Sequence, residues 1–234
     1  MTPIIVLNLE RAPGRKEIMI QQFQNLRMDE NLHYYFMSAF DGRYMTNLTL
    51  NANIGLGYGA GRAFQKGELG IIMTHIAALK FAQMMNWDNV IIMEDDVILC
   101  EDWHKRLDTL FELLPSTWEY VYLSGHSDYI KFSDYYNVDK GNPTITKSPK
   151  MVGAFSYMVN KNSYSKISKF TSSFMTTFDD LIMHMIDQQK LLSYTYFPFM
   201  TFHNANESFV WGQEKQGHVT GTMHSSYKYF KNKI

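Results

Sequence analysis

The stretch VIIMEDD, residues 90–96, decides the fold of this 234-residue chain. Its first four residues form a continuous apolar run, which is typical of a central strand that is covered on both faces. Three carboxylates, Glu94, Asp95 and Asp96, follow directly. The carboxyl end of a strand is the edge at which open α/β sheets bind their ligands. We therefore expect a buried strand that ends in a ligand site.

Strand and helix patterns alternate on both sides of this stretch. Apolar, β-branched and aromatic runs predict further strands at residues 4–7, 33–40, 120–123, 154–159 and 194–199. Apolar residues at helical spacing predict helices at residues 16–26, from 67–70 to about 85, at 103–114, at 162–170 and after Asp179-Asp180. This alternation indicates an α/β fold with a Rossmann-like, largely parallel central sheet flanked by helices. We expect a single domain over residues 1–234.

Composition and charge exclude several classes of protein. The chain carries 22 Lys and Arg against 23 Asp and Glu, so it lacks the basic footprint of a nucleic-acid-binding protein. The single cysteine, Cys100, excludes an intramolecular disulfide framework and a cysteine-based zinc site. The first residues do not resemble a signal peptide, and no stretch has the ~20 apolar residues of a membrane span. We expect a soluble protein in a reducing, cytoplasmic compartment.

The polar segments between these elements carry less information. The glycine-rich run at residues 55–61 does not come straight off a strand or open a helix, as a dinucleotide-binding loop must. We interpret it as a flexible or ligand-covering loop. Residues 125–150, which are broken by glycine and proline, are expected to form a surface excursion, and the chain from residue 204 a surface wrap.

The acidic triplet has the composition of a divalent-cation site. Side chains alternate along an extended chain, which places Glu94 and Asp96 on one side and Asp95 on the other. Two carboxylates can then converge on Mn²⁺ or Mg²⁺, which would relieve their repulsion and bridge to a diphosphate. His203, just after the last predicted strand, could supply a nitrogen ligand. The alternative is a solvated acidic turn.

Polar residues also follow the first predicted strand. Asn8, Arg11 and Arg15 should lie at the same edge of the sheet, where arginine can grip phosphate and asparagine can hold a base or a ribose. The alternative is a solvated helix start. His75 lies in an otherwise apolar helix, where a lone histidine is more often a hydrogen-bonded core residue than a ligand.

Asp179 and Asp180 open a predicted helix and allow two interpretations. A carboxylate is routine as the N-cap, at Asp179, or in the first turn, at Asp180. Either residue could instead be a general base that takes a proton from an acceptor hydroxyl. The sequence pattern leaves both interpretations open.

Several segments together resemble glycosyltransferase family 25, which includes bacterial lipooligosaccharide galactosyltransferases and the collagen galactosyltransferase domains. The resemblance runs from about residue 3 to about residue 208, and the order and spacing of its segments are specific. The segments are IVLNLER (5–11) with Arg15, AFDG (39–42), GELG (67–70) with Thr74-His75, VIIMEDDV (90–97), GAFSY (153–157), and Phe178-Asp179 with Pro198. The chain departs from the family pattern at Thr177, where proline or a similar residue is usual, and at Thr74, where serine is frequent.

The resemblance implies a GT-A-like fold, a donor such as UDP-galactose or UDP-glucose, and an inverting transfer assisted by Mn²⁺ or Mg²⁺. Glu94 and Asp96 would match the acidic metal motif, and His203 is our further candidate ligand. We expect a nucleotide-sugar half over about residues 1–125, an acceptor half over about 126–208 and a C-terminal wrap over 209–234. The residues expected at the donor are Asn8, Leu9, Arg11, Arg15, Asp41, Gly42, Gly67, Glu68, His75 and Asp95.

The expected reaction is a single displacement onto a hydroxyl of a glycan or glycoprotein. Asp179 would deprotonate this hydroxyl, with Asp180 as the reserve base. Two other functions stay open at this point. One is a metal-dependent phosphohydrolase or nucleotidyltransferase, and the other is a non-catalytic module that binds a nucleotide sugar.

Overall fold

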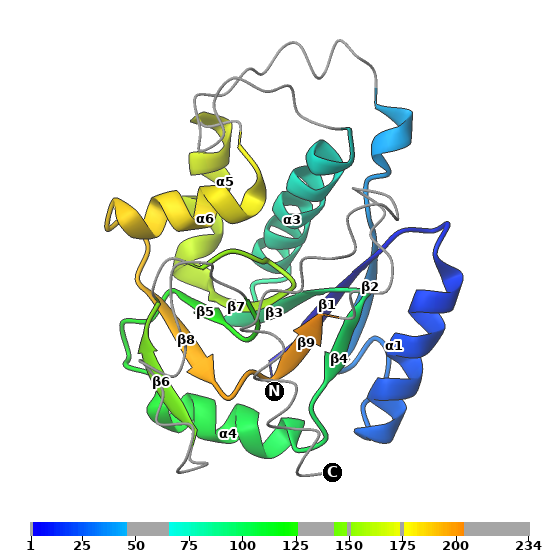
Figure 1. The fold of residues 1–234 in the computed structure, drawn as a ribbon, viewed down its shortest axis with the longest axis horizontal. Coiled ribbons are helices and arrows are strands. Elements are labelled where there is room, and N and C mark those ends of the chain that lie inside the picture. Colours follow the sequence, from blue (N-terminus) through cyan, green and yellow to red (C-terminus); the bar gives the residue numbers. More distant parts are fainter. Residues whose placement is uncertain (1, 46–65, 126–142, 149–150, 174–175, 204–234) are drawn as a thin grey trace.

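The computed structural model describes residues 2–45, 66–125, 143–148, 151–173 and 176–203. Within these ranges one large mixed sheet carries most of the strands, and a two-stranded ribbon joins it (Figure 1). The strands are β1 (Ile4–Asn8), β2 (Tyr34–Ser38), β3 (Asn89–Glu94), β4 (Val97–Leu99), β5 (Tyr120–Tyr122), β6 (Thr144–Lys147), β7 (Ser156–Asn160), β8 (Ser193–Phe197) and β9 (Thr201–His203). The helices are α1 (Pro13–Asn25), the 3-10 helix η1 (Gly42–Tyr44), α3 (Lys66–Met84), α4 (Trp103–Leu113), α5 (Lys161–Ser173) and α6 (Phe178–Asp187).

The large sheet is mostly parallel. Its strand order is β2-β1-β3-β7-β5-β8-β6. The pairings show that β2, β1, β3, β5 and β8 run in one direction, while β7 and β6 run against them. The short strands β4 and β9 form the antiparallel ribbon. The α/β architecture expected of a GT-A-like domain is therefore confirmed.

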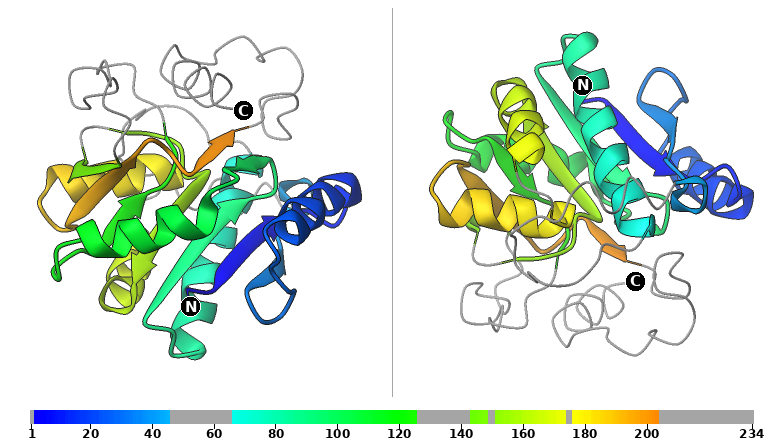
Figure 2. Two further views of the ribbon diagram at one scale, coloured as in Figure 1. Left: turned by 90° about the horizontal axis from the view of Figure 1, so that it is seen from below. Right: turned by 90° about the horizontal axis from the view of Figure 1, so that it is seen from above.

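Helices cover both faces of the sheet, and the alternation of side chains along each strand supplies both cores. In β1, Ile5 and Leu7 face the core formed with α3, α5 and α6. Ile4 and Val6 face the opposite core, which contains residues of α1 and α4. The two further views in Figure 2 show these helices on opposite sides of the strands. This double burial explains why β1 and β3 read as continuous apolar runs.

Most predicted elements are present, and the differences are local. The short strands β4, β6 and β9 were not predicted. Strand β6 lies within the expected surface excursion at 125–150. Most of that excursion, the loop at 46–65 and the C-terminal wrap at 209–234 lie outside the described residues.

Two details near the candidate site correct the sequence analysis. β3 ends at Glu94, and Asp95 and Asp96 form a turn, so the alternation of an extended chain does not reach Asp96. Thr177, not Asp179, is the N-cap of α6, and its hydroxyl accepts a hydrogen bond from the backbone N–H of Asp180 at 3.3 Å. Thr177, at which the chain departs from the family pattern, thus caps this helix, which begins at Phe178.

Among the described residues, no helix combines the length and the apolar character that crossing a bilayer would require.

Candidate active site at the carboxyl edge of the sheet

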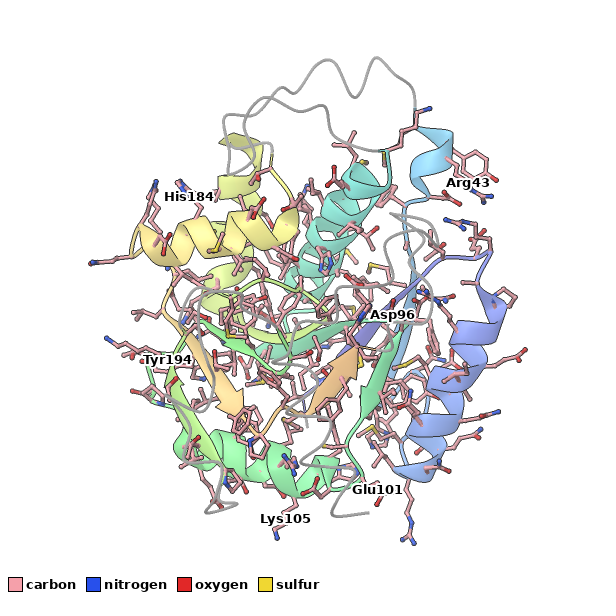
Figure 3. The ribbon with its side chains drawn as sticks, viewed as in Figure 1. Arg43, Asp96, Glu101, Lys105, His184 and Tyr194 are labelled. Atoms are coloured by element: carbon pink, nitrogen blue, oxygen red, sulfur yellow. The ribbon has the colours of Figure 1, made fainter. Side chains whose placement is uncertain are left out.

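The ends of three neighbouring strands bring the predicted polar residues to one edge of the sheet. Because β2, β1 and β3 are parallel, Ser38, Asn8 and Glu94 end their strands at the same level, with Asn8 opposite Ser38 and Leu7 opposite Glu94. Figure 3 shows Asp96 near the centre of the molecule beside β9, and Arg43 toward the outside near η1. Asn8 and Glu94 therefore lie at the same edge of the sheet, as the sequence predicted.

Asp95 joins the first strand, the first helix and the end of β3. Its Oδ2 accepts a hydrogen bond from Asn8 Nδ2 at 2.7 Å, and its Oδ1 accepts one from Arg15 Nη1 at 3.0 Å. Asp95 is buried. Burial raises the pKa of its carboxyl, while the hydrogen bond and charge of Arg15 oppose that rise. Three residues expected at the donor, Asn8, Arg15 and Asp95, are therefore brought into contact with one another.

Asp96 has one engaged and one unengaged carboxylate oxygen. Oδ2 accepts a hydrogen bond from Arg15 Nη1 at 3.1 Å and lies 3.3 Å from His203 Nε2. Oδ1 is buried and has no hydrogen-bond partner. A buried oxygen without a partner is costly unless a ligand engages it. This atom is the most direct sign of a ligand at the edge.

His203 lies at the acidic triplet, as predicted, but it faces Asp96. Burial lowers the pKa of His203, yet the hydrogen bond and charge of Asp96, together with Glu94, outweigh this effect and raise the pKa overall. The imidazole also stacks on Phe155, with ring centroids 4.3 Å apart. His203 Nε2 therefore faces Asp96 Oδ2 at 3.3 Å, and the two side chains form an ion pair when the imidazole is protonated.

Glu94 faces the buried helix α3. Burial and the neighbouring charge of Asp96 raise the pKa of its carboxyl well above the usual value, and the Asp179 charge adds to the rise. His75 Nε2 lies 3.7 Å from Glu94 Oε1. The cluster thus places Glu94, Asp96 and Asp179 close enough for their charges to interact.

His75 is a core residue directly behind Glu94. It is 1% exposed, its Nδ1 lies 2.8 Å from the Tyr157 hydroxyl, and its ring stacks on Phe178 with centroids 4.3 Å apart. Burial lowers the pKa of His75 to about 4, so the imidazole is neutral near pH 7. His75 is therefore surrounded as a hydrogen-bonded core residue would be, which is one of the two interpretations of the sequence. Tyr157, which the sequence analysis did not single out as a site residue, lies within the GAFSY segment.

Asp179 is held by the turn before β7. Its two oxygens accept hydrogen bonds from the backbone N–H groups of Gly153, at 3.0 Å, and Ala154, at 2.9 Å. Gly153 has a φ of 100°, a conformation that residues with a Cβ rarely adopt. Burial raises the pKa of Asp179, while the charge of His75 and the two backbone hydrogen bonds oppose this rise. The reserve base, Asp180, accepts a hydrogen bond from Thr176 Oγ1 at 3.3 Å.

A cleft of about 650 Å³ opens at the ends of β1 and β2. Residues 38–41 and 43–45 line it, together with Glu10, Arg11 and Met73. Among the lining side chains, Tyr44 is 82% exposed. A cleft with guanidinium groups and an exposed aromatic ring offers the chemistry to hold a phosphate and a planar base.

Two arginines share one carboxylate in this cleft. Arg11 Nε donates to Asp41 Oδ2 at 2.9 Å, and Arg43 Nη2 donates to the same oxygen at 2.7 Å. The hydrogen bond from Arg43 is the main reason that the pKa of Asp41 falls to about 2. Arg11 and Asp41 were both expected near the donor. Arg43 was missed, although it directly follows the AFDG segment.

Three of the remaining donor candidates, Gly42, Gly67 and Glu68, lie around the junction of η1 with α3, and Leu9 lies between β1 and α1. A Cβ on Gly42 would lie 2.2 Å from the Lys66 carbonyl oxygen, so only glycine lets these two backbones approach. Gly67 and Glu68 lie in the first turn of α3, and Glu68 is buried. Leu9 accepts a hydrogen bond from the Ala12 N–H through its carbonyl oxygen at 2.8 Å. The close approach of the backbones at positions 42 and 66 is therefore sufficient to explain the glycine at position 42, and no ligand is needed for it.

The donor set at the triplet fits a hard divalent cation only in part. An unpartnered carboxylate oxygen, Asp96 Oδ1, is a suitable ligand for Mn²⁺ or Mg²⁺. Within the described ranges, however, no three or more His, Cys, Asp or Glu side chains are arranged so that they could hold a metal ion. These residues therefore offer a partial site, which oxygen atoms of a bound substrate would have to complete.

Comparison with known proteins agrees with this geometry. The model of a family described as "Glycosyltransferase family 25 (LPS biosynthesis protein)" matches residues 1–182. The chain therefore belongs to glycosyltransferase family 25.

The individual relatives are distant and longer. "Inactive glycosyltransferase 25 family member 3" of Homo sapiens is 27% identical over 130 residues, which cover 51% of this chain and 21% of that protein. "Glycosyltransferase 25 family member" of Aedes aegypti is 31% identical over 110 residues, 44% of this chain and 17% of that protein. The chain spans about a fifth of the length of these relatives. Among solved structures, the glycosyltransferase GlyE of Streptococcus pneumoniae aligns with a TM-score of 0.47 and 10% identity, covering 97% of this chain and 59% of that one.

Proposed function

We propose that this member of glycosyltransferase family 25 transfers a hexose from a UDP-sugar to a hydroxyl of a glycan or glycoprotein. Galactose and glucose are the donor sugars that the family resemblance favours. The transfer is inverting and depends on a divalent cation, Mn²⁺ or Mg²⁺. The observation that carries the proposal is Asp96 Oδ1, a buried carboxylate oxygen without a hydrogen-bond partner. Asp96 follows the carboxyl end of β3, and β3 pairs with β1, one of the two strands that end at the cleft.

The cleft at β1 and β2 supports the donor half of the proposal. Arg11 and Arg43 bring guanidinium groups to one side of it, and the exposed ring of Tyr44 can stack on a base. Since β1 lies between β2 and β3, a nucleotide in this cleft would direct its diphosphate toward the acidic triplet. A bound divalent cation would supply positive charge to the diphosphate as it leaves.

Asp179 is the base in this proposal. The turn at Gly153 and Ala154 fixes its carboxylate through two hydrogen bonds, and burial raises its pKa. It takes the proton from the acceptor hydroxyl while the oxygen attacks the anomeric carbon from the face opposite to the diphosphate. Besides burial, the charges of both Asp96 and Asp179 raise the pKa of Glu94, which supports an acceptor side close to the leaving-group side.

The names of several relatives favour a second candidate function. The human, bovine, rat and mouse proteins are called inactive or probable inactive family members. A chain of this kind would be a module that binds the nucleotide sugar without turnover. The orphaned Asp96 oxygen would then serve binding alone.

The deciding experiment is a transfer assay with radiolabelled UDP-galactose and UDP-glucose, Mn²⁺, and a panel of glycan acceptors. We expect labelled glycan from the wild-type chain, and a loss of roughly 10²–10³-fold in kcat/KM for Asp96→Ala. Asp108→Ala, an exposed carboxylate on α4, is the matched control and should retain activity. Free labelled sugar without transfer would indicate a hydrolase, and binding without turnover would indicate the second function. Full activity of Asp96→Ala would refute the assignment.

A further inference from the structure

A series of polar contacts runs from β7 through α3 to the end of β3. The Tyr157 hydroxyl, on β7, lies 2.8 Å from His75 Nδ1, on α3. The other ring nitrogen, His75 Nε2, lies 3.7 Å from Glu94 Oε1. Tyr157 and His75 are buried, whereas the side chain of Glu94 is 26% exposed. The series therefore leads from the core of the protein to the candidate active site.

Aromatic packing fixes the plane of the His75 ring. The ring stacks on Phe178, with centroids 4.3 Å apart, and on Tyr157, with centroids 5.6 Å apart. Tyr157 in turn stacks on Tyr120, with centroids 4.9 Å apart. These rings come from α6, β7 and β5, so a rotation of the imidazole would disturb the packing of several elements. Each ring nitrogen therefore keeps its own neighbour.

One neutral tautomer of His75 suits both neighbours. With the proton on Nδ1, the lone pair of Nε2 would face the lone pairs of a Glu94 oxygen, which is unfavourable in a buried setting. With the proton on Nε2, the N–H group faces this oxygen, and Nδ1 accepts a hydrogen bond from the Tyr157 hydroxyl. Burial lowers the pKa of His75 to about 4 and raises the pKa of Tyr157 well above its usual value. Near pH 7 the imidazole is therefore neutral and the phenol can donate.

We propose that Tyr157 and His75 are positioning residues for Glu94. The Tyr157 hydroxyl donates to Nδ1 and so keeps the His75 proton on Nε2, and the Nε2–H group holds the Glu94 carboxylate in one orientation at the edge of the sheet. The separation of 3.7 Å is longer than a hydrogen bond, and we expect it to shorten when substrate occupies the edge. The inference rests on the proposed function, since it assumes that Glu94 takes part in the transfer.

Glu94 requires such a restraint because other carboxylates lie close to it. Burial and the charges of Asp96 and Asp179 raise the pKa of Glu94, so these charges repel its ionised form. An N–H group that faces one oxygen attracts the carboxylate without adding a net charge to the edge. The neutral imidazole of His75 can therefore orient Glu94 without neutralising it.

The first test compares two phenylalanine variants in the same aromatic cluster. Tyr157→Phe removes the hydroxyl that reaches His75 and keeps the ring. Tyr120→Phe is the matched control, because the Tyr120 hydroxyl is equally buried and has no hydrogen-bond partner in the described part of the chain. In the transfer assay we expect kcat of Tyr157→Phe to fall roughly 10- to 100-fold, because a small displacement of a group at the reaction is costly. Its donor KM, and both constants of Tyr120→Phe, should stay within about twofold of the wild type.

A double-mutant cycle tests whether Tyr157 acts through Glu94. Glu94→Gln keeps the shape of the side chain and removes its charge. If Tyr157 acts through Glu94, adding Tyr157→Phe should lower the residual kcat of Glu94→Gln by less than about twofold. A loss in this background as large as in the wild type would show that the Tyr157 hydroxyl acts only on the packing of the core, and it would overturn the proposal.

A measurement on the wild-type chain decides the matter if a variant does not fold, which thermal unfolding will show. Nitrogen-15 NMR of the histidine-labelled chain distinguishes protonated from unprotonated ring nitrogens, and His75→Gln identifies the signals of His75 among the eight histidines. We expect a neutral ring with its proton on Nε2. In Tyr157→Phe the Nδ1 signal should move to that of a nitrogen that accepts no hydrogen bond. A proton on Nδ1 in the wild type, or an Nδ1 signal that is unchanged in Tyr157→Phe, overturns the proposal.

These outcomes are separable from those of the proposed function. If the chain transfers sugar and Tyr157→Phe is as active as Tyr120→Phe, the transferase stands and the positioning role is wrong. If the chain transfers no sugar but the NMR signals are as expected, the contacts that hold Glu94 are supported and the transfer reaction is rejected.

Discussion

Asp95→Ala tests whether the acidic triplet is anchored to the fold as the structure indicates. The substitution removes the acceptor of two hydrogen bonds, from Asn8 at 2.7 Å and from Arg15 at 3.0 Å. A hydrogen bond to a charged group contributes about 1.5–3 kcal/mol, and removing one partner of a buried ion pair costs about 3–5 kcal/mol. Because Arg15 keeps Asp96 as a partner, we expect the lower end, a loss of about 3 kcal/mol.

The assay is equilibrium unfolding in urea, followed by circular dichroism, with a thermal scan in parallel. For a domain of this size, about 3 kcal/mol corresponds to a decrease in Tm of roughly 6–12 °C. The slope of the free energy of unfolding against urea should not change, because the core is intact. The matched control is Asp88→Ala, which removes the exposed ion pair with Lys161 and should cost at most about 1 kcal/mol.

The anchoring role of Asp95 is tested by comparing the loss of stability in Asp95→Ala with the loss in Asp88→Ala. If Asp95→Ala loses no more stability than Asp88→Ala, the network among β1, α1 and the end of β3 does not stabilise the fold. The anchoring role of Asp95 would then be wrong, and its carboxylate would be available to a ligand instead.

Two further predictions concern the base and the buried histidine. Gly153→Ala should cost roughly 1–2 kcal/mol, because its φ of 100° disfavours a side chain. It should also lower kcat more than it changes the donor KM, since the N–H groups of Gly153 and Ala154 hold Asp179; steady-state kinetics with an unchanged kcat would contradict this role. The pKa of His75 falls from 6.5 to about 4 on folding, so the unfolded chain binds more protons between these values and the wild type loses stability as the pH falls through this window. The loss is of the order of 3 kcal/mol. Urea unfolding at several pH values should show a flatter profile in this window for His75→Gln, and an equally steep profile would refute the assignment.

The local pattern of the sequence was sufficient to predict the main strands and helices of this protein. The apolar runs at β1 and β3 and the helical spacing in α1, α3 and α4 survive in the structure because each element buries a continuous face of the sheet or the helix. The carboxyl ends of parallel strands share one edge, so Asn8 and Glu94 could be placed together from chain order alone.

What each polar side chain contacts was decided only by the tertiary structure. The sequence could not show that Arg15 links Asp95 to Asp96, because the partners are 80 and 81 residues apart. Nor could it show that His75 lies buried behind Glu94, where four elements pack together. Periodicity records which side of an element faces the core, whereas these pairings depend on the turn after β3 and on the packing of α1 and α3 against the sheet. The fold could therefore be predicted from local pattern, and the chemistry of the edge follows from contacts that only folding brings about.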